Sequence, residues 1–125
     1  MRAAPLILLG FATFLLASCQ KQLEAPTERG VCWHIVTSDK GKPKFNRLAT
    51  GQPDLEHCAA ELEKMRLNFR ALGANQDAVD GAFQGQFLFV RPEGVFTAQN
   101  VTDHRYVLMV RTGDGRLAVP GAMPQ

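Results

Sequence analysis

One stretch of the chain, residues 55–72, has the apolar spacing of a long helix, and it limits the fold more than any other feature. Its apolar side chains recur every three or four residues, which places them on one stripe of a helix. The stripe consists of Leu55, Cys58, Ala59, Leu62, Met65, Phe69 and Leu72. Residues 50–54 read as a helix start, with Pro53 suited to the first helical position, and Gly73 is a natural stop.

Short runs rich in β-branched and aromatic residues predict strands on both sides of this helix. Segments such as Pro92-Glu93-Gly94 have the composition of turns between them. Residues 74–84 are expected to form a polar connection. The predicted strands are 31–37, 45–49, 86–91, 95–98, 105–111 and 117–119. This pattern predicts an α+β fold, a small single domain in which an antiparallel β-sheet of four to six strands has one long α-helix packed on one face.

The chain begins with a segment that has the parts of an export signal. Arg2 and the amino terminus supply positive charge, and eleven apolar residues follow from Leu6 to Leu16. A helix needs about 20 residues to span a bilayer, so this segment is too short for a permanent anchor. We therefore exclude it from the folded domain.

The leader ends in Leu16-Ala17-Ser18-Cys19, an aliphatic residue and two small residues before a cysteine. This resembles the lipobox of bacterial lipoproteins. The resemblance implies cleavage before Cys19 and acylation of that residue by chains such as palmitate, which would hold the protein on the lipid bilayer. Gln20 follows the cysteine where Asp would favour the inner membrane, which implies the outer membrane, facing the periplasm. The alternative is an ordinary secretory signal, or an uncleaved anchor, with an incidental cysteine.

These features divide the chain into four parts: a signal peptide (1–18), a lipidated N-terminus with a flexible tether (19–30), an α+β domain (31–120) and a tail (121–125). The tether lacks apolar periodicity and contains proline and glycine. As a coil, residues 20–30 would span roughly 18 Å, so partners should lie near the anchoring leaflet.

Two further cysteines, Cys32 and Cys58, lie in the mature part. An exported chain occupies an oxidising compartment, where such a pair is expected to form a disulfide. Closing this loop stabilises the fold by about 3.5 kcal/mol in the chain-entropy model. Because Cys58 lies on the apolar stripe, Cys32 should point toward the helix together with His34, whereas Trp33 and Ile35 should point to the opposite face.

The predicted sheet has more apolar surface than one helix can cover. In the run QFLFV (86–90), apolar residues point to both faces, whereas a solvated face would be polar. Two explanations compete. Residues 74–84, the strand at 45–49 and the tail could fold over the second face, or the sheet could curl on itself. Alternatively, this face, with Trp33 and Ile35, is a docking surface for an envelope protein or a second copy.

The charge balance argues against a nucleic-acid partner. The chain has 14 Lys and Arg against 12 Asp and Glu, and the leader contributes only Arg2 to these counts. A nucleic-acid binder would normally show a concentrated basic face. One basic cluster occurs in the hairpin expected around residues 38–43, and its members are Lys40, Lys42, Lys44 and Arg47. It is either a solvated loop or a contact for lipid headgroups, lipopolysaccharide phosphates or an acidic partner.

Four residues form an apparent metal-ligand set: Cys32, His34, His57 and Cys58. However, adjacent residues on a helix point about 100° apart, and paired zinc ligands usually lie two or more residues apart. We expect no metal and no cofactor. Glu61 and Glu63 point in different directions and are interpreted as solubilising surface charges. With no nucleophile elbow, phosphate loop or CxxC motif, we expect no catalysis.

The expected function is therefore that of an accessory binding or structural lipoprotein that engages an envelope protein or itself. A strand, a helix with Ala59, Ala60 and Leu62, and the strand GQFLFV resemble half of a SPOR-type peptidoglycan-binding domain. That family repeats strand and helix twice, and no second long helix is predicted here, so no binding residues are carried over. A cell-wall binder and a periplasmic inhibitor of an enzyme remain alternatives.

Overall fold

The computed structural model describes residue 3 and residues 22–37 and 40–121. The rest of the leader, the lipobox with Cys19 and the end of the tail lie outside these described residues. The described part is mostly β-structure with one helix, so the α+β class is confirmed. Its elements are β1 (Cys32–Thr37), β2 (Pro43–Ala49), α1 (Leu55–Ala71), β3 (Val79–Phe83), β4 (Gln86–Arg91), β5 (Gly94–Ala98), β6 (Tyr106–Arg111) and β7 (Leu117–Ala118).

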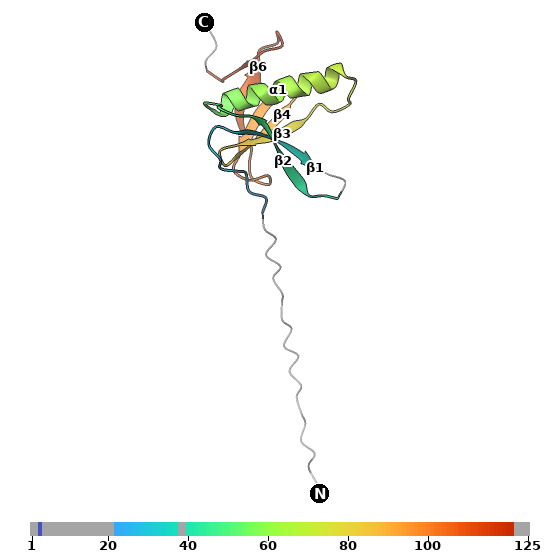
Figure 1. The fold of residues 1–125 in the computed structure, drawn as a ribbon, viewed down its shortest axis with the longest axis vertical. Coiled ribbons are helices and arrows are strands. Elements are labelled where there is room, and N and C mark those ends of the chain that lie inside the picture. Colours follow the sequence, from blue (N-terminus) through green and yellow to red (C-terminus); the bar gives the residue numbers. More distant parts are fainter. Residues whose placement is uncertain (1–2, 4–21, 38–39, 122–125) are drawn as a thin grey trace.

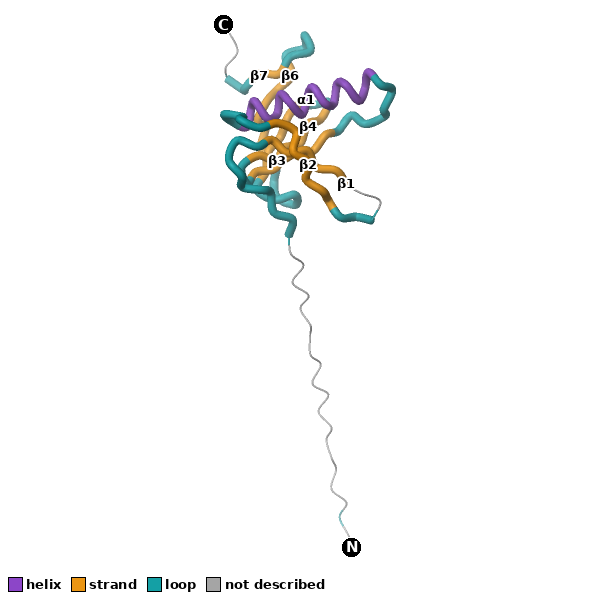
Figure 2. The backbone as a smooth tube through the Cα atoms, viewed as in Figure 1, coloured by secondary structure: helices purple, strands orange, loops and turns teal. Residues whose placement is uncertain are grey.

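The strands form one antiparallel sheet of seven strands in the order β2-β1-β3-β4-β5-β6-β7, which is more than the four to six expected. Helix α1 lies across one face of this sheet (Figure 1). The β1–β2 hairpin extends away from the helix (Figure 2). In the part of the chain that the structure describes, one face of the sheet is therefore covered by α1 and the other carries no helix.

Helix α1 begins and ends almost where the sequence predicts. The Asp54 carboxylate caps it by accepting a hydrogen bond of 2.8 Å from the His57 backbone N–H. Pro53 therefore precedes the cap and is not the first helical residue. At the other end Gly73 has a φ of 82°, the conformation that favours glycine after a helix. Leu72 is 84% exposed and does not belong to the buried stripe.

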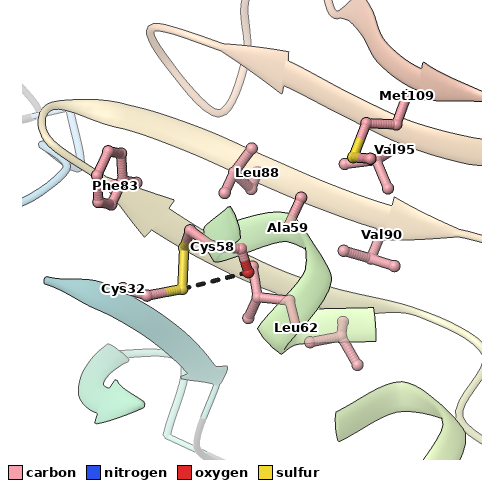
Figure 3. Close-up of a cluster of buried hydrophobic side chains, with 10 residues drawn as sticks. Cys32, Cys58, Ala59, Leu62, Phe83, Leu88, Val90, Val95 and Met109 are labelled. Carbon is pink, nitrogen blue, oxygen red and sulfur yellow. Dashed lines mark hydrogen bonds between the residues drawn. A yellow bond between two sulfur atoms is a disulfide. The ribbon is translucent and has the colours of Figure 1, made fainter. Parts of the chain in front are cut away.

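The predicted disulfide lies in the core between α1 and the sheet. Cys32 on β1 and Cys58 on α1 are bonded, with their Cα atoms 5.2 Å apart, and both are fully buried (Figure 3). Leu62 of the helix and Leu88 of β4 pack in the same cluster. The Cys32 Sγ also lies 3.4 Å from the Cys58 carbonyl oxygen, which is a close contact because a disulfide sulfur has no proton to donate. The bond thus joins the first strand to the helix, as predicted.

Strand β3 corrects the expectation that residues 74–84 form a polar connection. It lies near the centre of the sheet, between β1 and β4. Gly81 lowers its strand propensity, but α1 crosses so closely that a Cβ there would lie 2.5 Å from both the Trp33 carbonyl oxygen and Leu62 Cδ1. Gln84 and Gly85, with φ values of 44° and 85°, then form the tight turn into β4.

Glu63 is also placed differently from the prediction. Its side chain is only 9% exposed and receives four hydrogen bonds of 2.8–3.1 Å, two from Arg66 and two from Arg111. Burial alone would raise the pKa of Glu63, but these hydrogen bonds outweigh it and hold the pKa below its ordinary value. Glu63 is thus a buried link between α1 and β6, whereas Glu61 forms a surface ion pair with Lys64.

The segment predicted as a flexible tether up to residue 30 packs against the sheet from residue 23 onward. Ala25 is 8% exposed, and the Pro26 carbonyl accepts a hydrogen bond of 2.9 Å from the Gly85 N–H. The Gly30 N–H donates to the Gln84 side chain at 2.8 Å. The folded part therefore begins before residue 31. Among the described residues, no helix has the length and apolar character needed to cross a membrane.

Candidate binding face

The face of the sheet opposite α1, called here the helix-free face, carries a second apolar cluster. Trp33 and Ile35 of β1 belong to it, as predicted, because Cys32 points to the other face. The buried members are Ala25, Ala82, Phe87, Phe89 and Ala98, and the partly buried ones are Leu23, Trp33, Ile35, Phe45 and Phe96. Both faces of the sheet are therefore apolar, as the sequence indicated.

The part of the chain that covers this face differs from the one that the sequence suggested. Residues 79–83, expected to fold over the face, are a strand of the sheet itself. Leu23 and Ala25 of the N-terminal segment pack on the cluster instead. Polar arginine side chains cover a further part of it. The sequence did not suggest either kind of cover.

Three arginines lie over aromatic rings of the helix-free face. Arg47 lies 5.2 Å from the centre of the Trp33 ring, while Arg105 and Arg91 lie 3.7 Å and 5.7 Å from the centre of the Phe89 ring. A guanidinium is attracted to the face of an aromatic ring, and its aliphatic stem covers apolar surface. This explains how Phe89 is only 2% exposed without a helix above it.

Two of these arginines have a carboxylate partner. Arg47 Nη2 lies 3.0 Å from the Glu28 carboxylate, and Arg91 Nη1 lies 2.7 Å from the Asp80 carboxylate. Arg105 takes part in none of the ion pairs formed by the described residues. The guanidiniums of Arg91 and Arg105 therefore lie near the same Phe89 ring, and the Asp80 carboxylate pairs with Arg91.

An open cleft of about 700 Å³ borders this pair of arginines. Arg91 and Arg105 line it together with the apolar side chains of Phe96 and Val101. Glu93 and Asp103 also contribute to its wall, but neither forms an ion pair with these arginines. The cleft therefore combines cationic, apolar and anionic groups within a small area.

The predicted basic cluster is divided by the structure. Lys40, Lys42 and Lys44 are exposed on the β1–β2 hairpin. Arg47, although on the same hairpin, lies over Trp33 and pairs with Glu28. Arg47 thus belongs to the helix-free face, and the three lysines form the exposed basic part of the hairpin.

The four apparent metal ligands do not come together as a set. The disulfide uses both cysteine sulfurs, and His57 Nδ1 lies 2.6 Å from the Asp54 carboxylate at the start of the helix. His34 packs against Phe69, and burial lowers its pKa although the charge of Asp80 acts in the opposite direction. Within residues 22–37 and 40–121, no group of three or more His, Cys, Asp or Glu side chains could hold a metal ion.

Sequence reasoning missed Arg91, Arg105 and Asp80 as members of a site. The available signal was an arginine at one end of each apolar strand, in QFLFVR and RYVLMVR. Such a position alone does not show whether the side chain enters solvent or folds back over a neighbouring strand. The ring it covers, Phe89, lies on β4, whereas Arg105 directly precedes β6.

In comparisons with known proteins, no family model matches the chain, and no curated protein or solved structure matches it significantly. Function must therefore be inferred from the residues and their geometry.

Proposed function

We propose that the protein is a lipid-anchored envelope lipoprotein that acts as a binding module without catalysis, with the helix-free face as its binding surface. Its partner is an envelope protein at the anchoring membrane. The proposal combines the lipobox Leu16-Ala17-Ser18-Cys19 with the location of the N-terminal segment on this face.

The packing of the N-terminal segment carries the proposal. Leu23 and Ala25 lie on the helix-free face, and Leu23 is only four residues after the cysteine that the lipobox assigns to acylation. Four residues span at most about 14 Å even when fully extended. Acyl chains on Cys19 would therefore hold this face close to the membrane surface, where a membrane-associated partner can reach it.

The chemistry of the face also suits recognition. Aromatic and arginine side chains are enriched at the centres of protein interfaces. Here Trp33, Phe96 and three arginines lie on one side of the sheet. Val107 is paired with Phe96 across β5 and β6 and is 53% exposed, which adds apolar surface next to Phe96.

Lipid attachment is tested by expressing the full chain and a Cys19→Ala variant in a Gram-negative host and measuring intact masses. We expect the unaltered protein to lose residues 1–18 and to gain the mass of a diacylglycerol and a further acyl chain. The Cys19→Ala protein should carry no lipid and should leave the membrane fraction or remain as a precursor. An unaltered chain that keeps its leader and gains no lipid would refute the anchor.

The binding surface is tested by photo-cross-linking in the same cells. A photoreactive residue is placed at Val107 on the helix-free face or, as the matched control, at Leu67, which is 45% exposed on α1. We expect a discrete adduct from position 107, identified by mass spectrometry, and none from position 67. Equal adducts from both positions, or none from position 107, would contradict the assignment of the face.

A further inference from the structure

We infer that the cleft beside Arg91 and Arg105 binds a carboxylate carried next to an apolar side chain, as in an acidic peptide segment of a protein partner. This inference rests on the proposed function, because it names the chemistry that the helix-free face would recognise. Its basis is the combination, in one cleft, of a guanidinium that forms no ion pair within residues 22–37 and 40–121, an aromatic support and an apolar wall.

The first step concerns the geometry of Arg105. Its guanidinium carbon lies over the Phe89 ring, 3.7 Å from the ring centre, which is contact distance. A stacked guanidinium is held in place through its face, while its N–H groups point outward along its edges. Because Arg105 has no carboxylate partner among the described residues, those donors remain available to a ligand.

The second step concerns charge. Arg91 and Arg105 both lie within 6 Å of the Phe89 ring centre, and only Arg91 is paired, with Asp80. Glu93 and Asp103 line the same cleft without pairing to either arginine, so the attraction for a further carboxylate is local to the Arg105 guanidinium. A carboxylate can accept two parallel N–H bonds from a guanidinium, which adds geometric selectivity to the charge attraction.

The third step distinguishes a peptide from an anionic membrane surface. Glu93 and Asp103 line the same cleft and would repel a uniformly anionic surface. A peptide can present a single carboxylate to Arg105 and keep other groups beside these acids. Phe96 and Val101 line the cleft, and Val107 is paired with Phe96. These side chains offer an apolar contact for the residue next to the carboxylate.

The test uses the mature lipidated protein in detergent micelles, isotopically labelled for NMR. The probe is N-acetyl-phenylalanine, in which a carboxylate lies beside an aromatic ring, and the matched probe is its neutral amide. We expect the acid to shift the amide resonances of residues 91–105 in a saturable manner and the neutral amide to bind at least about tenfold more weakly. This difference corresponds to the loss of a charge-assisted hydrogen-bonded pair.

Variants then assign the effect to the guanidinium. Arg105→Gln should weaken binding of the acid by at least about tenfold. Arg105→Lys keeps the charge and most of the stem, and it should also weaken binding because it lacks the planar fork. Arg29→Gln removes the same charge from an exposed residue outside the cleft and should leave binding unchanged.

Several results would overturn the inference. Equal binding of the acid and its amide, unchanged binding by both Arg105 variants, or shifts confined to other residues would each do so. Inorganic phosphate that bound as tightly as the acid would show that the cleft selects charge alone. A position-107 cross-link without binding of the acid probe would refute the carboxylate cleft while supporting the binding face. Loss of both would refute the proposed function as well.

Discussion

Replacing Glu63 by glutamine removes a carboxylate that accepts hydrogen bonds from both Arg66 and Arg111. The substitution keeps the shape of the side chain, but it removes the negative charge and places an NH₂ donor where guanidinium donors already point. Arg66 has a side chain only 4% exposed, and Arg111 is 21% exposed. Both guanidiniums would be left close together without the Glu63 charge, and each would keep one other partner: the Asp77 carboxylate at 3.6 Å from Arg66 and the Arg91 carbonyl at 2.7 Å from Arg111.

Removing one partner from a buried ion pair typically costs 3–5 kcal/mol. Because water can partly reach Arg111, we expect the lower end of this range, a loss of about 3 kcal/mol in the free energy of unfolding. Glu61→Gln provides the matched control on the same helix. Glu61 pairs with Lys64 at 3.1 Å on the surface, and its loss should cost no more than about 1 kcal/mol.

The assay is urea unfolding of the mature protein with its disulfide intact, followed by far-ultraviolet circular dichroism at several pH values. The pKa of Glu63 is lower in the folded protein than its ordinary value. Its stabilising contribution is therefore fully present above the ordinary range for glutamate and is lost as pH falls through the folded-state pKa. The difference between the unaltered protein and Glu63→Gln should shrink over that range. A loss no larger than that of Glu61→Gln, or a difference that does not change with pH, would refute the reasoning.

Two further predictions concern the core. Gly81→Ala should lower the free energy of unfolding by about 2–3 kcal/mol, because the new methyl group would lie 2.5 Å from the Trp33 carbonyl oxygen, which is held by the pairing of β1 with β3. A urea midpoint equal to that of the unaltered protein would contradict this close approach. Joint replacement of Cys32 and Cys58 by alanine should cost about 3.5 kcal/mol, the chain-entropy estimate for the loop between them. Adding a reductant should lower the urea midpoint of the unaltered protein and not that of the double variant, and a midpoint insensitive to reductant in both would contradict a structural disulfide.

Most of the elements could be predicted because their signals are local. Helix α1 follows from its apolar spacing, the Asp54 cap and the glycine after its last turn. The disulfide was predicted from the number of cysteines and the expected export, and its presence confirms which residues of β1 face the helix. Strand β3 was missed because Gly81 has a low strand propensity, and the reason for a glycine there lies in the approach of a helix.

The candidate site was predictable only in outline. Trp33 and Ile35 were placed on the correct face because alternation along a strand is a local property. The arginines that cover the face, and the cleft beside them, were not predicted. Arg105 and Phe89 lie on different parts of the chain, and their contact depends on how β4, β5 and β6 pair.

The amino-acid sequence by itself determined the helix, the two-sided apolar character of the sheet and the pairing of the two cysteines. These depend on the period of side chains along one element and on the chemistry of single residues. The tertiary structure alone decided that Glu63 is buried between two arginines. It also decided that Leu23 and Ala25 cover part of the helix-free face and that Arg105 lies over the Phe89 ring. Each of these features depends on contacts between residues far apart in the chain. Such contacts stabilise the protein only after the strands have paired and brought the residues together.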